Sequence, residues 1–336
     1  MDEWMAWLLD GPPWVAYRTR LDLMGQGERD EDVQRARGEM LSHPLVQGLL
    51  QQLADWPEPA LTSHKSAGHP IHLLSFVSEL GLNQGDAELS GIIERILERQ
   101  SAAGPFYIQV KIPLHFGGSG KEEPAWFLCD APLVTAALVR MGLGEDERIQ
   151  RAVESLLGLV CDNGWRCTVS PEMGRFRGPG RKGDPCPYAN LVILKLLAAL
   201  PEQHDSPPAR LGAETLLQLW QNRREQHPYL FRMGTDFCKL KAPLVWYDLL
   251  HLCDVLTQFA WLRDDPRLLE MVEMVRQKGD AKGRFVPESI WKAWKDWDFG
   301  QKREPSRWLT FLSQRVLFRM GGYGIERQTE DGIGYL

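Results

Sequence analysis

The chain has 336 residues, of which 43% are hydrophobic and 25% are charged, and its net charge of −6 argues against binding nucleic acid over a broad surface. The length permits one large domain or two ordinary ones with a sizeable core. Thirteen tryptophans, an unusually high number, require a large core, an aromatic-lined cavity or both.

The N-terminal residues, MDEWMAWLLDGPPW, carry acidic side chains where a signal peptide would carry positive charge. Nowhere in the sequence does a run of apolar residues approach the ~18 that a membrane-spanning helix needs. Six cysteines without an export signal are typical of reduced thiols. We therefore expect a cytoplasmic protein with no transmembrane segment and no nucleic-acid partner.

Six apolar segments recur at intervals of about 60 residues, and each begins close to a proline. Proline suits the first turn of a helix, and glycine follows the end of several segments, as it does after many helices. The repeat therefore predicts six helices that are apolar around most of their surface. These segments begin at Pro13, Pro70, Pro124, Pro185, Pro243 and Pro305.

A second, amphipathic helix is predicted between the apolar segments, followed by a turn that combines glycine or proline with an aromatic residue. Four examples cover 88–100, 147–160, 213–226 and 267–279. Almost nothing in the sequence is typical of a strand. We predict an all-α protein, an (α/α)6 toroid or barrel of six helical hairpins, over residues 1–320, with a C-terminal tail at 321–336. An open helical-repeat array is the alternative, but inner helices that are apolar on most sides favour closure.

In such a toroid, the N-terminal ends of the apolar helices open at the same end of the ring. The residues near these ends are rich in aromatic rings with a few polar groups, as expected of a pocket for an apolar ligand, and helix N-termini favour an anionic head group. The predicted lining residues are His72, Trp126, Tyr188, Trp246, Tyr247 and Trp308. The candidate catalytic groups are Asp130, Asp248 and His251.

The loop before the fourth apolar segment, GRFRGPGRKGDPCPYANL at 174–191, combines cations with metal-binding residue types. Its cations are candidate contacts for a diphosphate or, alternatively, a solvated basic turn. They are Arg175, Arg177, Arg181 and Lys182. Asp184 and Cys186 are spaced so that both can reach one ion, and a zinc site would take its third ligand from Asp248 or His251.

The recurring glycine-aromatic turns resemble the repeats of the prenyltransferase and squalene-cyclase superfamily over most of the chain. Within them, GRFRGPGRKGDPCPY is similar to a segment of protein prenyltransferase β-subunits. The resemblance implies a turn at Phe176 and Gly178, a diphosphate contact at Arg181, and zinc ligands at Asp184 and Cys186. It also implies an isoprenoid diphosphate as the apolar small-molecule ligand, bound in an aromatic-lined central cavity, and zinc-assisted prenyl transfer.

The chain departs from this family pattern at two places. The third zinc ligand of the family is a histidine after an aromatic residue, and Asp248 follows Tyr247 here. Pro187 separates Cys186 from the aromatic residue that follows it directly in the family. The cyclase branch carries an Asp-x-Asp-Asp motif that this sequence lacks, which leaves Asp130 as a lone candidate acid.

Two other classes of function stay open. A polysaccharide-active (α/α)6 hydrolase or lyase needs paired carboxylates across a cavity, with Asp130, Asp248 and Asp298 as candidates. A non-catalytic scaffold needs only the rigid ring. Further candidate ligands for a metal or a phosphate are the histidines His64, His69 and His72 and the thiols Cys161, Cys167 and Cys186.

Overall fold

Helices make up most of the regular structure in the computed structural model, which describes residues 2–174, 176–178, 181, 183–228 and 230–321. The α-helices in this part of the chain are α1 Glu3–Leu9, α2 Pro13–Asp22, α3 Glu31–Ser42, α4 Pro44–Leu53, α5 Pro70–Leu80, α6 Ala87–Leu97, α7 Ala131–Leu138, α8 Glu147–Leu157, α9 Pro187–Leu197, α10 Pro207–Gln221, α11 Leu249–Leu256, α12 Pro266–Arg276 and α13 Arg307–Arg319. Strands β1 Ile108–Val110 and β2 Glu123–Ala125 pair antiparallel, with Ile108 opposite Ala125.

Short helical turns complete the regular structure of the described residues. They are η1 Leu114–Phe116, η2 Val139–Leu143, η3 Pro171–Met173, η4 Pro201–Gln203, η5 Ala260–Leu262 and η6 Lys292–Trp294. The turn η2 is a π-helical continuation of α7, and within it Gly142 has a φ of 94°, in the left-handed region that favours glycine. The prediction of a mostly helical protein is therefore confirmed, with one very short sheet.

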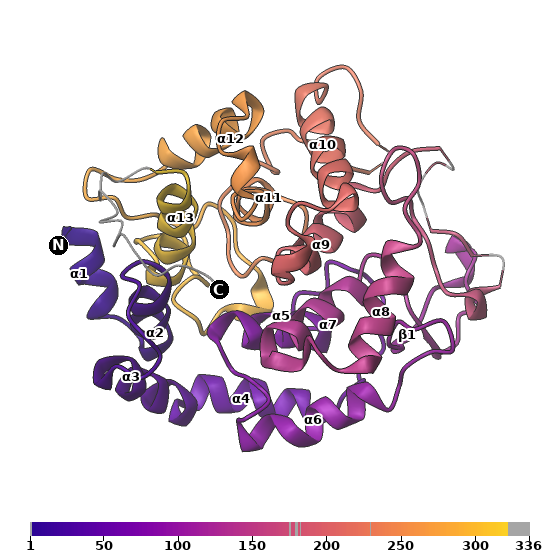
Figure 1. Ribbon diagram of the computed structural model, residues 1–336, viewed down its shortest axis with the longest axis horizontal. Coiled ribbons are helices and arrows are strands. Elements are labelled where there is room, and N and C mark those ends of the chain that lie inside the picture. Colours follow the sequence, from indigo (N-terminus) through magenta and orange to yellow (C-terminus); the bar gives the residue numbers. More distant parts are fainter. Residues whose placement is uncertain (1, 175, 179–180, 182, 229, 322–336) are drawn as a thin grey trace, which may run out of the picture.

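The apolar helices pack against one another in chain order (Figure 1). Helix α5 contacts α7, α7 contacts α9, α9 contacts α11, α11 contacts α13, and α13 contacts both α1 and α2. Each of α2, α5, α7, α9 and α11 also packs against a neighbour in the sequence, which is α3, α4, α8, α10 or α12 respectively. The first and last helices of the described chain are consequently neighbours in space.

Proline marks the start of several apolar helices, but two helices start later than predicted. Helices α2 and α5 begin at Pro13 and Pro70, in agreement with the prediction. Pro124 instead lies in β2, so α7 begins only at Ala131, and α11 begins at Leu249 rather than near Pro243. The residues between these prolines and their helices form non-helical segments, and those segments carry much of the candidate site.

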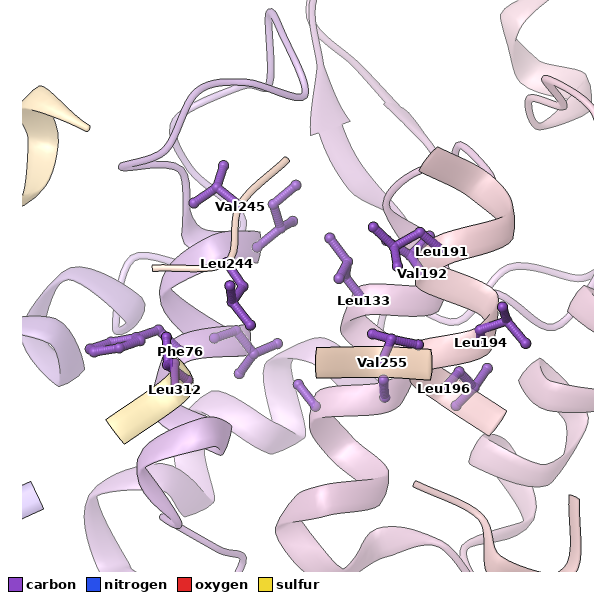
Figure 2. Close-up of a cluster of buried hydrophobic side chains, with 14 of the residues drawn as sticks. Phe76, Leu133, Leu191, Val192, Leu194, Leu196, Leu244, Val245, Val255 and Leu312 are labelled. Atoms are coloured by element: carbon purple, nitrogen blue, oxygen red, sulfur yellow. The ribbon is translucent and has the colours of Figure 1, made fainter. Parts of the chain in front are cut away.

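The space among the apolar helices is filled by side chains (Figure 2). Phe76 of α5, Leu133 of α7 and Leu312 of α13 lie near Leu244 and Val245, which come from the segment before α11. Further buried aliphatic side chains in this cluster come from α9 and α11: Leu191, Val192, Leu194, Leu196 and Val255. Side chains from the segment before α11 therefore occupy part of the space among the apolar helices.

A network of buried charges joins the C-terminal parts of the same helices. Lys195 of α9 donates to Glu79 of α5 at 2.5 Å and to Ser75 at 3.2 Å. Asp254 of α11 accepts from Arg315 at 2.8 Å and from Arg319 at 3.0 Å, both on α13. These pairs bridge two helix–helix boundaries, α5 with α9 and α11 with α13, so opposite charges join these helices near their C-terminal ends.

No α-helix in the described part of the chain has both the length and the apolar character that crossing a lipid bilayer requires. Of the predicted C-terminal tail at 321–336, only Gly321 is among the described residues.

Candidate functional site

Three cysteine thiols lie together at the N-terminal ends of α7 and α9. Cys129 stands just before α7, Cys167 follows α8 in a loop, and Cys186 is the N-cap residue of α9. Their Sγ atoms all lie within 4.8 Å of one another, and those of Cys129 and Cys186 are 3.8 Å apart. Among the described residues, these three thiols form the one group of three or more Cys, His, Asp or Glu side chains that is close enough to hold a single metal ion.

The thiol geometry fits a tetrahedral metal. A zinc–sulfur bond of about 2.3 Å and tetrahedral angles place two sulfur ligands about 3.8 Å apart. The separation of the Cys129 and Cys186 sulfurs, 3.8 Å, equals that value. Thiolate sulfur is also a soft donor that selects zinc and other thiophilic ions over calcium or magnesium. The residues present therefore fit a metal centre with three sulfur ligands.

The thiols of Cys129 and Cys186 hold their protons unless a cation joins them. A hydrogen bond with Cys129 lowers the pKa of Cys186, but a hydrogen bond with Cys167 and burial outweigh it and raise the pKa to about 12. A hydrogen bond with Cys167 and a second one with Cys186 raise the pKa of Cys129 well above its ordinary value. Binding a divalent cation would release these protons, so metal affinity at this cluster is expected to rise with pH.

The thiol cluster faces a mainly apolar cavity of about 240 Å³. The cavity lies where the segments before α5, α7, α9 and α11 meet. Its lining residues are Ser63, His64, Lys65, Cys129, Cys167, Arg181, Asp184, Pro185, Cys186, Pro187, Pro228, Leu230, Phe231 and Trp246. Because the wall combines thiols with proline, leucine and aromatic side chains, the cavity suits a small apolar group.

A histidine–carboxylate pair borders the same cavity. Nδ1 of His64 lies 2.8 Å from Oδ1 of Asp130, whose side chain is fully buried before α7. Burial lowers the pKa of His64, but Asp130, through its charge and its hydrogen bond, and Cys167 together outweigh burial and raise it. The other oxygen of the carboxylate, Oδ2 of Asp130, is buried without a hydrogen-bond partner.

Beside the thiol cavity lies a more cationic one of about 510 Å³. The two cavities share Lys65, Arg181, Leu230, Phe231 and Trp246. Arg232 and Lys241 add two more cations to the second cavity, against one carboxylate, Asp236. Its wall also includes the aromatic rings of Phe231, Phe237, Trp246 and Tyr247. An anionic head group would be favoured here, next to an apolar group in the thiol cavity.

Arg181 occupies a central position at this end of the molecule. It lines both of these cavities and also a third, of about 700 Å³, which borders Asp184 and α10. Arg177, by contrast, is exposed and donates hydrogen bonds to the backbone oxygens of Gly174 and Phe176. The other two predicted cations, Arg175 and Lys182, lie outside the described residues.

The predicted zinc ligands are not brought together as a set. Cys186 belongs to the thiol cluster, and Asp184 lines the same cavity, but its carboxylate is not in the close group. Asp248 caps α11, where its Oδ1 accepts from the backbone N–H of His251 at 3.0 Å. His251 uses Nδ1 to bond the backbone oxygen of Trp246 at 2.9 Å. The structure thus groups Cys186 with two thiols rather than with these side chains.

The predicted substrate-binding residues divide into two groups. Trp246 and Tyr247 line the cavities, and the ring of Tyr188 packs on Trp246 at 4.4 Å between centroids. Trp126 and Trp308 are buried and line none of the three cavities described here.

The remaining predicted side chains support the fold around the cavities. Nε2 of His72 donates to the backbone oxygen of His64 at 2.9 Å, and burial lowers the pKa of His72 to about 4. Burial also lowers the pKa of His251, to about 3, so its ring is neutral. Asp298, a candidate for sugar chemistry, accepts from Ser306 at 2.8 Å and from the backbone of Trp308 at the start of α13. Asp248 therefore caps α11, and Asp298 is bonded to the first turn of α13.

The buried carboxyl of Asp248 yields a testable stability prediction. Burial raises its pKa to about 6 although Lys241 lowers it, whereas an unfolded chain ionises near 3.9. As pH rises, the unfolded state loses this proton before the folded state does. The free energy of unfolding therefore falls between about pH 4 and pH 6 and stays lower above pH 6. Asp248→Asn keeps a good N-cap residue and is expected to raise the free energy of unfolding at pH 8 by about 2 kcal/mol. Urea unfolding at pH 4 and pH 8 measures this, and equal gains at both pH values would contradict it.

Several site residues escaped the sequence analysis. Cys129 was not singled out as a metal ligand, although it stands 57 residues before Cys186, close to one repeat length. Lys65, Arg232 and Lys241 were not predicted to bind a ligand. The repeat spacing was the one available signal for Cys129, and the three cations lie in loops whose positions depend on the fold.

Comparisons with known proteins leave the family open. No protein-family model matches the chain, and no curated protein does. A solved structure described as a protein from Actinoplanes is similar, with a TM-score of 0.41 and 15% sequence identity, over 92% of this chain and 90% of that one.

Proposed function

We propose that the chain is a zinc-dependent transferase, built as a closed α/α toroid, that binds a short isoprenoid diphosphate at the N-terminal ends of its inner helices. The observation that carries this proposal is the position of the three-thiol cluster. It lies in the wall of an apolar cavity that adjoins a second cavity lined by four cations. One ligand with an apolar body and an anionic head would occupy both.

The packing order of the helices supports the toroid. Contacts run from α5 through α7, α9 and α11 to α13, and α13 contacts α1 and α2. In a closed ring of this kind, the N-terminal ends of the inner helices share one face, where their free N–H groups favour negative charge. The thiol cavity is lined by residues that precede α5, α7, α9 and α11, which agrees with that arrangement.

The zinc would be held by Cys129, Cys167 and Cys186, and it would supply charge that keeps a bound acceptor thiol ionised at neutral pH. Side chains of the protein would bind the diphosphate and stabilise the reacting carbon. Lys65, Arg181, Arg232 and Lys241 line the space for the diphosphate, and the faces of Phe231 and Trp246 line the space where positive charge would develop on the allylic carbon. The new carbon–sulfur bond would form at that carbon as its bond to the diphosphate oxygen breaks.

The volume of the thiol cavity indicates the size of the apolar group that it can hold. At roughly 30 Å³ for a water-sized group, a volume of 240 Å³ holds about eight such groups. A five-carbon chain fits that space. Two of the carboxylates considered for polysaccharide chemistry are engaged in the fold: Asp248 caps α11, and Asp298 accepts from Ser306 before α13. Their engagement favours the transferase over a glycan-active enzyme.

Calorimetric titration of the zinc-loaded protein with dimethylallyl diphosphate tests the proposal. We expect binding that weakens about 10- to 100-fold in Arg181→Gln, because a charge-assisted contact with the diphosphate is lost. Arg177→Gln is the matched control and should bind as the wild type does, since Arg177 donates to neighbouring backbone oxygens. The proposal fails if neither dimethylallyl diphosphate nor pyrophosphate binds the zinc-loaded chain.

A further inference from the structure

We propose that His64 is the fourth ligand of the zinc centre and that Asp130 holds it in the metal-binding tautomer. This inference rests on the proposed function in one respect, because it requires that the three thiols bind zinc. It adds a residue that the motif in the loop at 174–191 does not contain, from a different repeat of the chain.

The hydrogen bond between His64 and Asp130 selects the ring nitrogen that is available to a metal. Nδ1 of His64 lies 2.8 Å from Oδ1 of the buried carboxylate, so the N–H of a neutral ring is placed at Nδ1. The lone pair is then on Nε2. Histidine ligands in metal sites regularly donate their second ring nitrogen to a carboxylate in this way, which fixes the ring and increases its basicity.

The position of His64 places it beside the thiols. His64, Cys129, Cys167 and Cys186 line the same cavity. The ring is packed edge-on against Phe127 at 5.6 Å and parallel to Trp246 at 6.4 Å, and the backbone oxygen of His64 bonds Nε2 of His72. The close group of ligand atoms holds the three thiols without His64, so zinc binding must bring the ring and the thiols closer together while Nδ1 keeps its bond to Asp130.

A half-satisfied buried carboxylate is the independent observation. Oδ1 of Asp130 is bonded to His64, but Oδ2 has no hydrogen-bond partner although the side chain is buried, and a buried polar atom without a partner is costly. A zinc ion with three thiolates, together with Asp130, carries a net negative charge that Lys65 and Arg181 on the cavity wall offset. Asp130 stays paired with His64 when the metal is bound, and the resting centre then has three sulfur ligands and one nitrogen ligand, which an acceptor thiol would displace.

Cobalt(II) substitution of the full-length protein tests the assignment, because the visible bands of tetrahedral cobalt report the ligand set without any activity assay. We expect His64→Ala to bind one cobalt per chain with shifted bands, and to bind zinc at least 10-fold more weakly in competition with a chromophoric chelator. Added imidazole should restore the wild-type spectrum. Asp130→Asn should weaken zinc binding about 10- to 100-fold while the bands stay those of a nitrogen-containing set.

His115→Ala is the control for metal bound at an exposed histidine and should match the wild type in affinity and spectrum. Circular dichroism of each variant establishes that it is folded. The assignment is overturned if His64→Ala has the wild-type spectrum and zinc affinity and imidazole has no effect. Failure of the wild type to bind either metal would overturn the proposed zinc centre and, with it, this assignment.

Discussion

Replacing Cys186 with alanine is expected to abolish tight zinc binding. Structural zinc sites with four ligands bind with about 10–16 kcal/mol in total, so one thiolate contributes about 3–4 kcal/mol, or roughly a 100- to 1,000-fold change in affinity. Cys186 lies 3.8 Å from Cys129 across the cluster, and both are needed for a set of three sulfurs. Elemental analysis of purified protein, followed by chelator competition, measures the loss.

The matched control for this experiment is Cys161→Ala. Cys161 is also a reduced, partly buried cysteine close to α8, but it is outside the thiol cluster, and its thiol donates weakly to the backbone oxygen of Leu159. We expect this variant to keep about one zinc per chain. Equal zinc content and affinity in the wild type and in Cys186→Ala would show that the cluster does not hold the metal.

The second large effect is expected in the buried charge network. Asp254→Asn removes the carboxylate that accepts hydrogen bonds from Arg315 and Arg319, and Asp22, 3.3 Å from Arg315, only partly replaces it. Breaking a buried ion pair by removing one partner typically costs 3–5 kcal/mol, because the remaining charge is uncompensated. We expect the free energy of unfolding at pH 7 to fall by about that amount in urea titrations. Asp205→Asn, in an exposed pair with Arg210, should change it by less than about 1 kcal/mol.

The same carboxylate makes the wild type sensitive to acid. Burial raises the pKa of Asp254, but Arg315 and Arg319 outweigh burial and hold the pKa well below its usual range. A carboxyl with a depressed pKa stabilises the folded state above its unfolded value of about 3.9, and this stability is lost as pH falls below that value. In Asp254→Asn, the loss of stability between pH 5 and pH 3 should therefore be smaller than in the wild type. An unchanged acid dependence would contradict this role for Asp254.

The periodic pattern of the sequence was a good guide to the helices. Apolar residues with helical spacing after Pro13 and Pro70 form α2 and α5, and the amphipathic segment at 147–160 contains α8. These predictions succeeded because proline at the first turn and a regular apolar face are local features of the sequence. The same reasoning placed α7 and α11 too early. At Pro124 the chain pairs as strand β2, and that pairing depends on a partner, β1, which local propensity does not reveal.

The candidate site was predictable only in part. The motif around Asp184 and Cys186 indicated a metal near the start of α9, and the structure places the Cys186 thiol in the one three-thiol group of the described chain. Cys129 and Cys167 join it because α7 packs on α9 and the loop after α8 returns between them. Asp248 was predicted from the sequence to be a metal ligand, but its side chain caps α11 by accepting a hydrogen bond from the backbone N–H of His251.

The sequence by itself determined which segments form helices and the order in which they follow one another. Both depend on residues that are close together in the chain. Only the tertiary structure decided which side chains share a cavity. His64 and Asp130 are 66 residues apart, and their hydrogen bond exists because the packing of α5 on α7 brings the two loops together. Ligand geometry depends on distances of a few ångströms between such loops, and the sum of many long-range packing contacts sets those distances.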